Sequence, residues 1–257
     1  MAGALSRGID ILILLGSAPN GLEPAEIATR LRVPPSTVYR ILRVLRHKGL
    51  VTNGSDGEGY RLGAIVLQWA AAVQRGFSVV ETAAPRIRAI AEHTGDTVQL
   101  TVLSGLSAVT VDIAEGTAPV RVAPERGRAL PLYCGAAAKA ILAFLPEHRW
   151  QDVIRTTGLT ALTRRTLTDP VRLRADLRLT RSRGYAISEE EVYEGARAVA
   201  APLFDGGGAV CASIGVAGPM HRLRGERLKR IADLVVHEAA SLSRAPRADR
   251  AGAVRKA

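Results

Sequence analysis

The sequence predicts an α+β protein in which a short helical region with a β-hairpin precedes a larger domain built around an antiparallel sheet. Apolar residues recur at helical spacing over the first fifty positions. Beyond residue 95, alternating strands come first, helices follow, and a second strand pair precedes a long last helix. This order is typical of α+β domains, and 257 residues are enough for two domains.

Composition narrows the classes of partner. The net charge is +11 at pH 7, which favours nucleic acid, an anionic surface or acidic ligands without choosing among them. Two cysteines, Cys134 and Cys211, are too few for a disulfide scaffold or a structural zinc site, and the five histidines show no metal-ligand spacing. We expect no metal and no cofactor. The apolar run 9–15 is interrupted by Asp10 and too short to span a bilayer, so we expect a cytoplasmic protein without a membrane partner.

Three helices are expected before residue 50. Apolar residues at near-helical spacing predict the first over residues 5–16. Pro24 suits the first turn of the second, where its missing N–H costs nothing. The sequence "RVPP" ends that helix, because a residue before proline is pushed out of the α region, and a third helix can begin at Pro35.

The third helix has one apolar and one polar face. Its apolar stripe comprises Val38, Ile41, Leu42 and Leu45, and the opposite face carries Ser36, Thr37, Tyr39, Arg40 and Arg43. Two helices joined by a few residues form a helix-turn-helix pattern, whose second helix enters the major groove of DNA. Hydroxyls can reach phosphates there, and arginines can bind phosphates or a guanine edge.

The segment "LVTNGSDGEGYRLG" predicts a hairpin after the third helix. Gly49 stops the helix, and Asn53-Gly54 and Asp56-Gly57 are candidate turns. Such a hairpin is a wing, from which Arg61 can reach the DNA backbone. A basic helix face is usually only solvated surface. Here no acid occurs between Glu26 and Asp56, and the helix-turn-helix spacing and the wing coincide with that span, so we favour double-stranded DNA as the partner.

Residues 1–62 are therefore the expected DNA-binding domain, and residues 63–77 a linker helix. The segment "AIVLQWAAAVQRG" is too apolar for a free linker. It is either a core helix or a dimer-forming helix, and we favour the second because a short DNA-binding domain gains affinity from two half-sites. A palindromic operator is then expected.

Residues 78–246 form the expected second domain. A helix is predicted over residues 79–93, and alternation predicts strands over 97–103 and 109–113. One or two further strands are expected over 120–134, then a helix over 136–145 and a mixed helical region to residue 183. Residues 205–208 are the expected turn of a hairpin, followed by a helix over 225–243. Residues 247–257 read as a disordered basic tail.

Small residues occupy one face of that hairpin. Cys211, Ser213, Gly215 and Ala217 alternate with larger residues, and alanines share a face on the partner strand. A face lined with small side chains either receives a closely packed helix or leaves a cavity. The residues alone favour the packed helix, because protein interiors rarely leave voids.

The chain resembles the IclR family of bacterial transcriptional regulators over about residues 5–245. "PPSTVYRILRVLRHKGLV" is similar to the family's recognition helix, and "LPLYCGAAAKAILAFLP" to its internal loop and helix. "GYAISEEEVYEGARAVAAPLFD" resembles its signature, which these residues fit: Gly184, Ser188, Glu191, Ala198, Val199, Ala200, Leu203, Phe204 and Asp205. Three segments in the right order make the match specific.

The resemblance implies a winged helix-turn-helix, a linker helix and a GAF-like α/β effector-binding domain. It implies a homodimer or homotetramer that represses or activates a catabolic operon, with a small-molecule effector altering DNA binding. It also favours a cavity at the small-residue face. By position, its effector-binding residues would be Val122, Tyr133, Ala136, Ser188, Ala198, Gly215 and Ala217.

Several of these positions depart from the family pattern. Tyr133 replaces a usual His, and Ala198, Gly215 and Ala217 stand where some carboxylate-binding members have Cys or Ser. Because lost hydroxyls remove donors for a carboxylate and dry the site, we expect an effector larger and more apolar than a two- or three-carbon acid, aromatic or cyclic. Pro35 stands where the family often has Lys.

Two other functions remain open at this stage. One is an enzyme that acts on a small metabolite through the second domain. Adjacent Glu189, Glu190 and Glu191 are the nearest approach to paired carboxylates, but three residues in a row cannot all face one site on a strand. No nucleophile and base occur together, so we expect no enzyme. The other is an architectural DNA binder without an effector.

Overall fold

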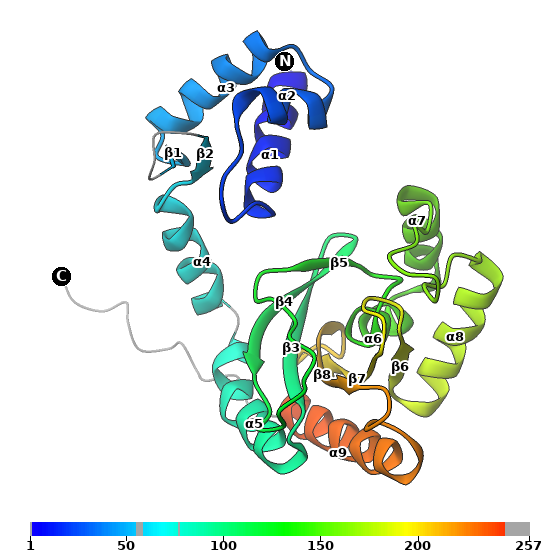
Figure 1. Ribbon diagram of the computed structural model, residues 1–257. Coiled ribbons are helices and arrows are strands. Elements are labelled where there is room, and N and C mark those ends of the chain that lie inside the picture. Colours follow the sequence, from blue (N-terminus) through cyan, green and yellow to red (C-terminus); the bar gives the residue numbers. More distant parts are fainter. Residues whose placement is uncertain (1, 55–58, 77, 245–257) are drawn as a thin grey trace. The chain divides into compact units, whose positions relative to one another are not determined.

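A computed structural model describes residues 2–54, 59–76 and 78–244. The chain divides into two compact units, residues 1–77 and 78–257, which Figure 1 shows with their elements labelled. The predicted tail 247–257 and the candidate turn Asp56-Gly57 lie outside the described residues.

The first unit is a three-helix core closed by a short hairpin. Its elements are α1 (Ala2–Gly16), α2 (Pro24–Leu31), α3 (Pro35–His47), β1 (Val51–Asn53), β2 (Tyr60–Leu62) and α4 (Ile65–Gly76). The two strands pair antiparallel, and a bridge from Leu22 to Tyr60 ties the hairpin to the turn before α2. The winged helix-turn-helix prediction is confirmed, with α1 beginning three residues earlier than expected.

The turn between α2 and α3 follows from its sequence. Arg32 adopts a left-handed conformation with φ 54°, and its N–H donates to Ala28 and Thr29, which ends α2. Pro34 is the N-cap of α3 and Pro35 its first helical residue, where proline's fixed φ favours the helix. The apolar stripe of α3 is buried against α1 and α2 in one cluster, as its spacing predicts.

The second unit is a six-stranded antiparallel sheet between helices. Its strands are β3 (Thr97–Ser104), β4 (Ser107–Ala114), β5 (Ala129–Pro131), β6 (Ala186–Glu189), β7 (Ala196–Phe204) and β8 (Val210–Pro219), in the order β5-β4-β3-β8-β7-β6. Its helices are α5 (Ser78–Thr94), α6 (Ala136–Phe144), α7 (Glu147–Thr157), α8 (Pro170–Arg183) and α9 (Gly225–Arg244). Helices α5 and α9 cover one face, and α6 covers the other, with α7 and α8 beside α6 (Figure 1).

The prediction of an antiparallel sheet is confirmed, with two differences. Residues 117–128 contain no strand, so only the short β5 represents the strands expected over 120–134. Strand β6 was not predicted, because its four residues lie inside a polar segment and are too few to show a period. The turn expected at 205–208 is present, and Asp205 accepts hydrogen bonds there from the amides of Gly207 (2.9 Å) and Ala209 (3.0 Å).

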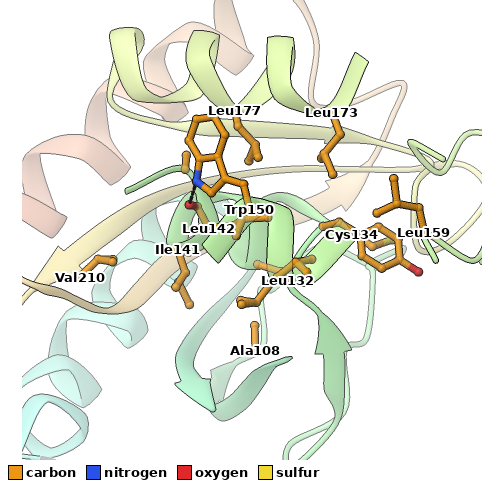
Figure 2. Packing of buried hydrophobic residues seen from close by; sticks show 14 residues of the cluster. Ala108, Leu132, Cys134, Ile141, Leu142, Trp150, Leu159, Leu173, Leu177 and Val210 are labelled. Carbon is orange, nitrogen blue, oxygen red and sulfur yellow. Dashed lines mark hydrogen bonds between the residues drawn. The ribbon is translucent and has the colours of Figure 1, made fainter. Parts of the chain in front are cut away.

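An apolar cluster joins α6, α7 and α8. Figure 2 shows Trp150 of α7 lying between α8 and α6, with its indole nitrogen donating to the carbonyl of Leu142 (2.7 Å). Leu173 and Leu177 of α8 are fully buried in it. The Arg181 guanidinium stacks on the Trp150 ring at 4.8 Å. Among the described residues, none of the helices has the length and apolar character needed to cross a membrane.

Replacing Leu177 by alanine should lower the free energy of unfolding of the second unit by about 2–5 kcal/mol, because the cluster would keep a cavity. Leu179→Ala on the same helix is the control, since Leu179 is 53% exposed and should cost within about 0.5 kcal/mol. Urea denaturation followed by Trp150 fluorescence, with Trp69 replaced by Phe, measures both. Equal losses in the two variants would contradict the packing described.

Candidate functional site

The outer face of α3 carries most of the residues predicted to contact DNA. Ser36, Tyr39, Arg40 and Arg43 are exposed there, and Thr37 is half-buried. No side chain caps the N-terminus of α3. Pro35 has no N–H and the Thr37 amide donates to the Pro34 carbonyl (2.9 Å), which leaves the Ser36 amide for water or a phosphate.

The cations of this face are not neutralised within the described chain. Arg40, Arg43 and Arg46 form no ion pair with any residue that the structure describes. In contrast, Arg30 on α2 is paired with Glu26. The outer face of α3 therefore presents a positive surface with hydroxyls at one end, an arrangement that suits a phosphate backbone.

Arg61, the sixth residue predicted to contact DNA, lies on β2. Its Nε donates to the carbonyl of Asn20 (3.3 Å) in the turn between α1 and α2. Its aliphatic part lies against Gly21, where a Cβ would come within 2.9 Å of the Arg61 Cγ. The side chain is thus held against that turn, and a phosphate contact by Arg61 stays a prediction.

A cavity lies between the sheet and the N-terminus of α6. Its empty volume is about 590 Å³, including the part open to solvent. Five of the seven residues predicted to bind an effector lie in its wall: Val122, Ala136, Ser188, Ala198 and Ala217. They come from four elements and one connection that are distant in sequence.

The small-residue face explains where this cavity begins. At one end of this face α6 packs closely, since Ala137 and Ala140 of α6 share a buried cluster with Ala200 of β7. Ser213 donates to the carbonyl of Ala137 (2.9 Å), which fixes α6 over this end of the face. Further along the same face, Ala198 and Ala217 pair with each other beyond the first turn of α6 and leave space. The small-residue face therefore receives a packed helix at one end and borders a cavity at the other.

Two predicted residues are not in the wall. Tyr133 is 2% exposed and belongs to the apolar cluster beside α6, where its hydroxyl donates to the carbonyl of Thr160 (2.6 Å). Gly215 is covered by its packing against Ala200. Their positions in the family pattern therefore do not correspond to contact with this cavity.

Six polar side chains in the wall were not predicted: Gln99, Thr110, Glu125, Arg128, Tyr193 and Arg197. Gln99 lies on the polar face of β3, and Thr110 on β4, whose register with β3 shifts between Leu100 and Thr101. The alternation of β3 assigns Gln99 to the polar face of the strand, so the sequence contains a signal that could have placed it in the wall. Arg128 and Tyr193 lie on irregular connections, where no period reveals the direction of a side chain.

A buried ion-pair network holds the edge of the cavity. Lys139 of α6 is 1% exposed and contacts Glu191 (2.5 Å), Asp176 of α8 (2.8 Å) and the carbonyl of Ile187 (2.9 Å). Glu191 also accepts from the amide of Gly135 (3.0 Å), which caps the N-terminus of α6. Burial raises the pKa of Glu191, and the positive charge of Lys139 acts against that shift.

Cys134 is a buried structural thiol. It contacts the carbonyl of Glu191 (3.2 Å), and burial, with the nearby Glu191 charge, raises its pKa to about 12. A neutral thiol is a weak nucleophile. Among the described residues, no group of three or more His, Cys, Asp or Glu could hold a metal ion.

The comparisons with known families agree with this architecture. Residues 4–54 match the IclR helix-turn-helix domain, and residues 71–244 match the bacterial transcriptional regulator IclR C-terminal domain. The chain belongs to the IclR family.

The named relatives of this IclR-family chain are regulators. It is 36% identical over 248 residues to the HTH-type transcriptional regulator BhcR of Paracoccus denitrificans (strain Pd 1222), covering 96% of this chain and 88% of that protein. An IclR transcriptional regulator from Alicyclobacillus acidocaldarius is 28% identical with a TM-score of 0.79, covering 94% of this chain and 97% of that chain.

A more distant fold neighbour carries a ligand. It is an IclR homologue from Microbacterium hydrocarbonoxydans in complex with 4-hydroxybenzoate, 20% identical with a TM-score of 0.75, covering 93% of this chain and 97% of that chain. The family and its named relatives identify this chain as a DNA-binding transcriptional regulator.

Cys134 should resist thiol reagents at pH 8 in the folded protein. A Cys211→Ser variant, which leaves Cys134 alone, should react with a disulfide reagent orders of magnitude more slowly when folded than in urea. Because folding raises this pKa, the neutral thiol's contribution to stability is complete below the unfolded pKa of about 8.5 and is lost as pH rises toward 12. Rapid labelling of the folded variant at pH 8 would refute the burial described.

Proposed function

We propose that this regulator recognises its operator through the outer face of α3 and responds to a small organic molecule in the cavity of the second unit. The observation that carries the first part is the acid-free outer face of α3, where Arg40, Arg43 and Arg46 lack ion-pair partners among the described residues. Ser36 and Thr37 lie at its N-terminal end, where a helix entering the major groove contacts base edges.

The effector proposal rests on the cavity wall. Val122 and the alanines of α6, β7 and β8 make much of it apolar, which suits a cyclic or aromatic molecule better than a two-carbon acid. The 4-hydroxybenzoate complex of the Microbacterium homologue supports a ligand in a domain of this fold. To act as an effector, the ligand must bind the DNA-competent and DNA-incompetent forms with different affinity.

We also propose that the protein binds DNA as a dimer or tetramer. Leu5, Ile9 and Ile13 lie four residues apart on α1 and are 71%, 48% and 65% exposed. Leu67 and Trp69 of α4 are 73% and 52% exposed. Exposed apolar side chains gathered on helices are typical of subunit interfaces, and two copies would read two half-sites of a palindromic operator.

Arg40→Ala should weaken binding to the protein's own operator by about 1–3 kcal/mol, roughly five- to 150-fold, and relax specificity at one base pair if Arg40 reads a base. Fluorescence anisotropy with the native upstream fragment and a scrambled fragment, at near-physiological salt, measures both effects. Arg155→Ala removes the same charge from an arginine that is 82% exposed in the second unit, and should leave affinity unchanged. Unchanged affinity in folded Arg40→Ala would refute the recognition role.

Leu67→Asp should shift the protein toward smaller oligomers, because it places a charge in the proposed α4 interface. Sedimentation velocity over a range of concentrations measures the shift, and operator affinity should fall with it. Val44→Asp is the control, since Val44 is 56% exposed on α3 and should weaken DNA binding without changing the oligomer. An unchanged sedimentation profile in Leu67→Asp would exclude α4 as an interface.

A further inference from the structure

Arg128 is the guanidinium in the cavity wall without a carboxylate partner among the described residues. Arg197, the other arginine of the wall, is paired with Glu189 (2.7 Å) and donates to the carbonyl of Leu223 (2.7 Å). Arg128 instead donates to the hydroxyl of Tyr193, and its guanidinium carbon lies 4.9 Å from the centroid of that ring. Glu125 is also in the wall but is exposed to solvent and forms no ion pair with Arg128.

The half-buried position of Arg128 makes this incomplete pairing notable. Arginine keeps its positive charge at all physiological pH, so burial cannot be offset by loss of the proton. Its five N–H donors are satisfied best by a carboxylate, which accepts two parallel hydrogen bonds. The main chain holds the residue in place, because the Thr110 amide donates to the Arg128 carbonyl (3.1 Å).

Two hydroxyls in the same wall, on residues that are largely buried, also lack protein partners. Thr110 is 6% exposed and Ser188 is 5% exposed, and neither hydroxyl bonds to a described residue. The same holds for the amide of Gln99. These three side chains line the cavity and are free to bond an occupant, so they mark where its polar groups would lie.

The rest of the wall is apolar and comes from Val122, Leu130, Val192 and the alanines of α6, β7 and β8. A hydrated inorganic anion would leave these surfaces unfilled, and a neutral hydrocarbon would leave Arg128 without a carboxylate. We propose that the ligand is an organic anion with a cyclic or aromatic body, and that Arg128 is the residue that binds its carboxylate. This inference rests on the proposed effector function of the cavity.

Tyr193 has a defined part in this arrangement. Arg128 ends the connection from β4 to β5, and Tyr193 lies on the connection from β6 to β7. Their contact joins the two connections through one neutral hydroxyl and a ring. A ligand carboxylate would replace the hydroxyl as the stronger acceptor, so binding would exchange a link between the two connections for a link to the ligand.

The experiment is calorimetric titration of the full-length protein with benzoate, phenylacetate and cyclohexanecarboxylate, and with the corresponding neutral amides. At least one carboxylate should bind, and its amide should bind at least tenfold more weakly. Arg128→Ala should weaken the carboxylate by about ten- to hundredfold without affecting the amide, as expected for a lost charged hydrogen bond. Arg128→Lys should recover part of the affinity.

Two matched variants separate the proposed role from a general loss of charge or structure. Arg126→Ala is the control on the same connection, because Arg126 is exposed and pairs with Asp112. The affinity of this variant for the carboxylate should stay within twofold of the wild-type value. Tyr193→Phe should bind the carboxylate at least as tightly as the wild type, since the competing hydroxyl is gone. Thermal unfolding shows whether each variant is folded. If Arg128→Ala does not fold, the comparison of acid with amide on the wild-type protein still decides the question.

The proposal is overturned if no carboxylate of the panel binds, if acid and amide bind equally, or if folded Arg128→Ala binds the acid as tightly as the wild type. Operator binding by the same proteins separates the two levels of inference. Ligands that shift operator affinity without dependence on Arg128 would refute the anion site and leave the effector function standing. A carboxylate that binds through Arg128 without any shift in operator affinity would refute the effector function alone.

Discussion

The buried ammonium group of Lys139 is the constraint on which the cavity of the second unit depends. It joins α6 to α8 through Asp176, to β6 through the Ile187 carbonyl and to the segment after β6 through Glu191. Removing one partner from a buried ion pair costs about 3–5 kcal/mol, because the other charge stays uncompensated. The network therefore fixes the N-terminus of α6 against the β6–β7 connection, and both segments contribute to the wall of the cavity.

The placement of small residues decides which part of the second unit is packed and which is open. Along one face of β7 and β8, α6 packs against Ala200, and Gly215 has no room for a side chain beside Ala200 on the neighbouring strand. Where α6 has not yet begun, side chains of the same size leave space beside Ala198 and Ala217. The position at which α6 begins therefore determines where the cavity lies, because β7 and β8 carry small side chains along the whole of this face.

Much of the fold could be predicted from sequence because its elements show a strong period. The apolar stripe of α3, the prolines before it and the alternation of β3 each have one physical reading, and the structure confirms them. The cavity was predicted less completely. Ser188, Ala198 and Ala217 followed from family positions on regular strands, whereas Arg128 and Tyr193 lie on connections whose course depends on tertiary contacts. Tyr133 lies outside the cavity wall, because a residue next to the N-terminus of α6 can face the sheet or the α7–α8 side, and sequence spacing does not distinguish them.

The alanines of the cavity wall make ligand preference adjustable by single substitutions. Ala198 and Ala217 point into empty space, so a hydroxyl, thiol or methyl group added there would alter the shape and polarity of the cavity while the strand pairing stays as it is. Gly215, two residues from Ala217 on the same strand face, allows no such change, because any side chain would collide with Ala200. Substitutions that change the ligand preference of this regulator, in nature or in a designed biosensor, are thus confined to one end of the β7–β8 pair.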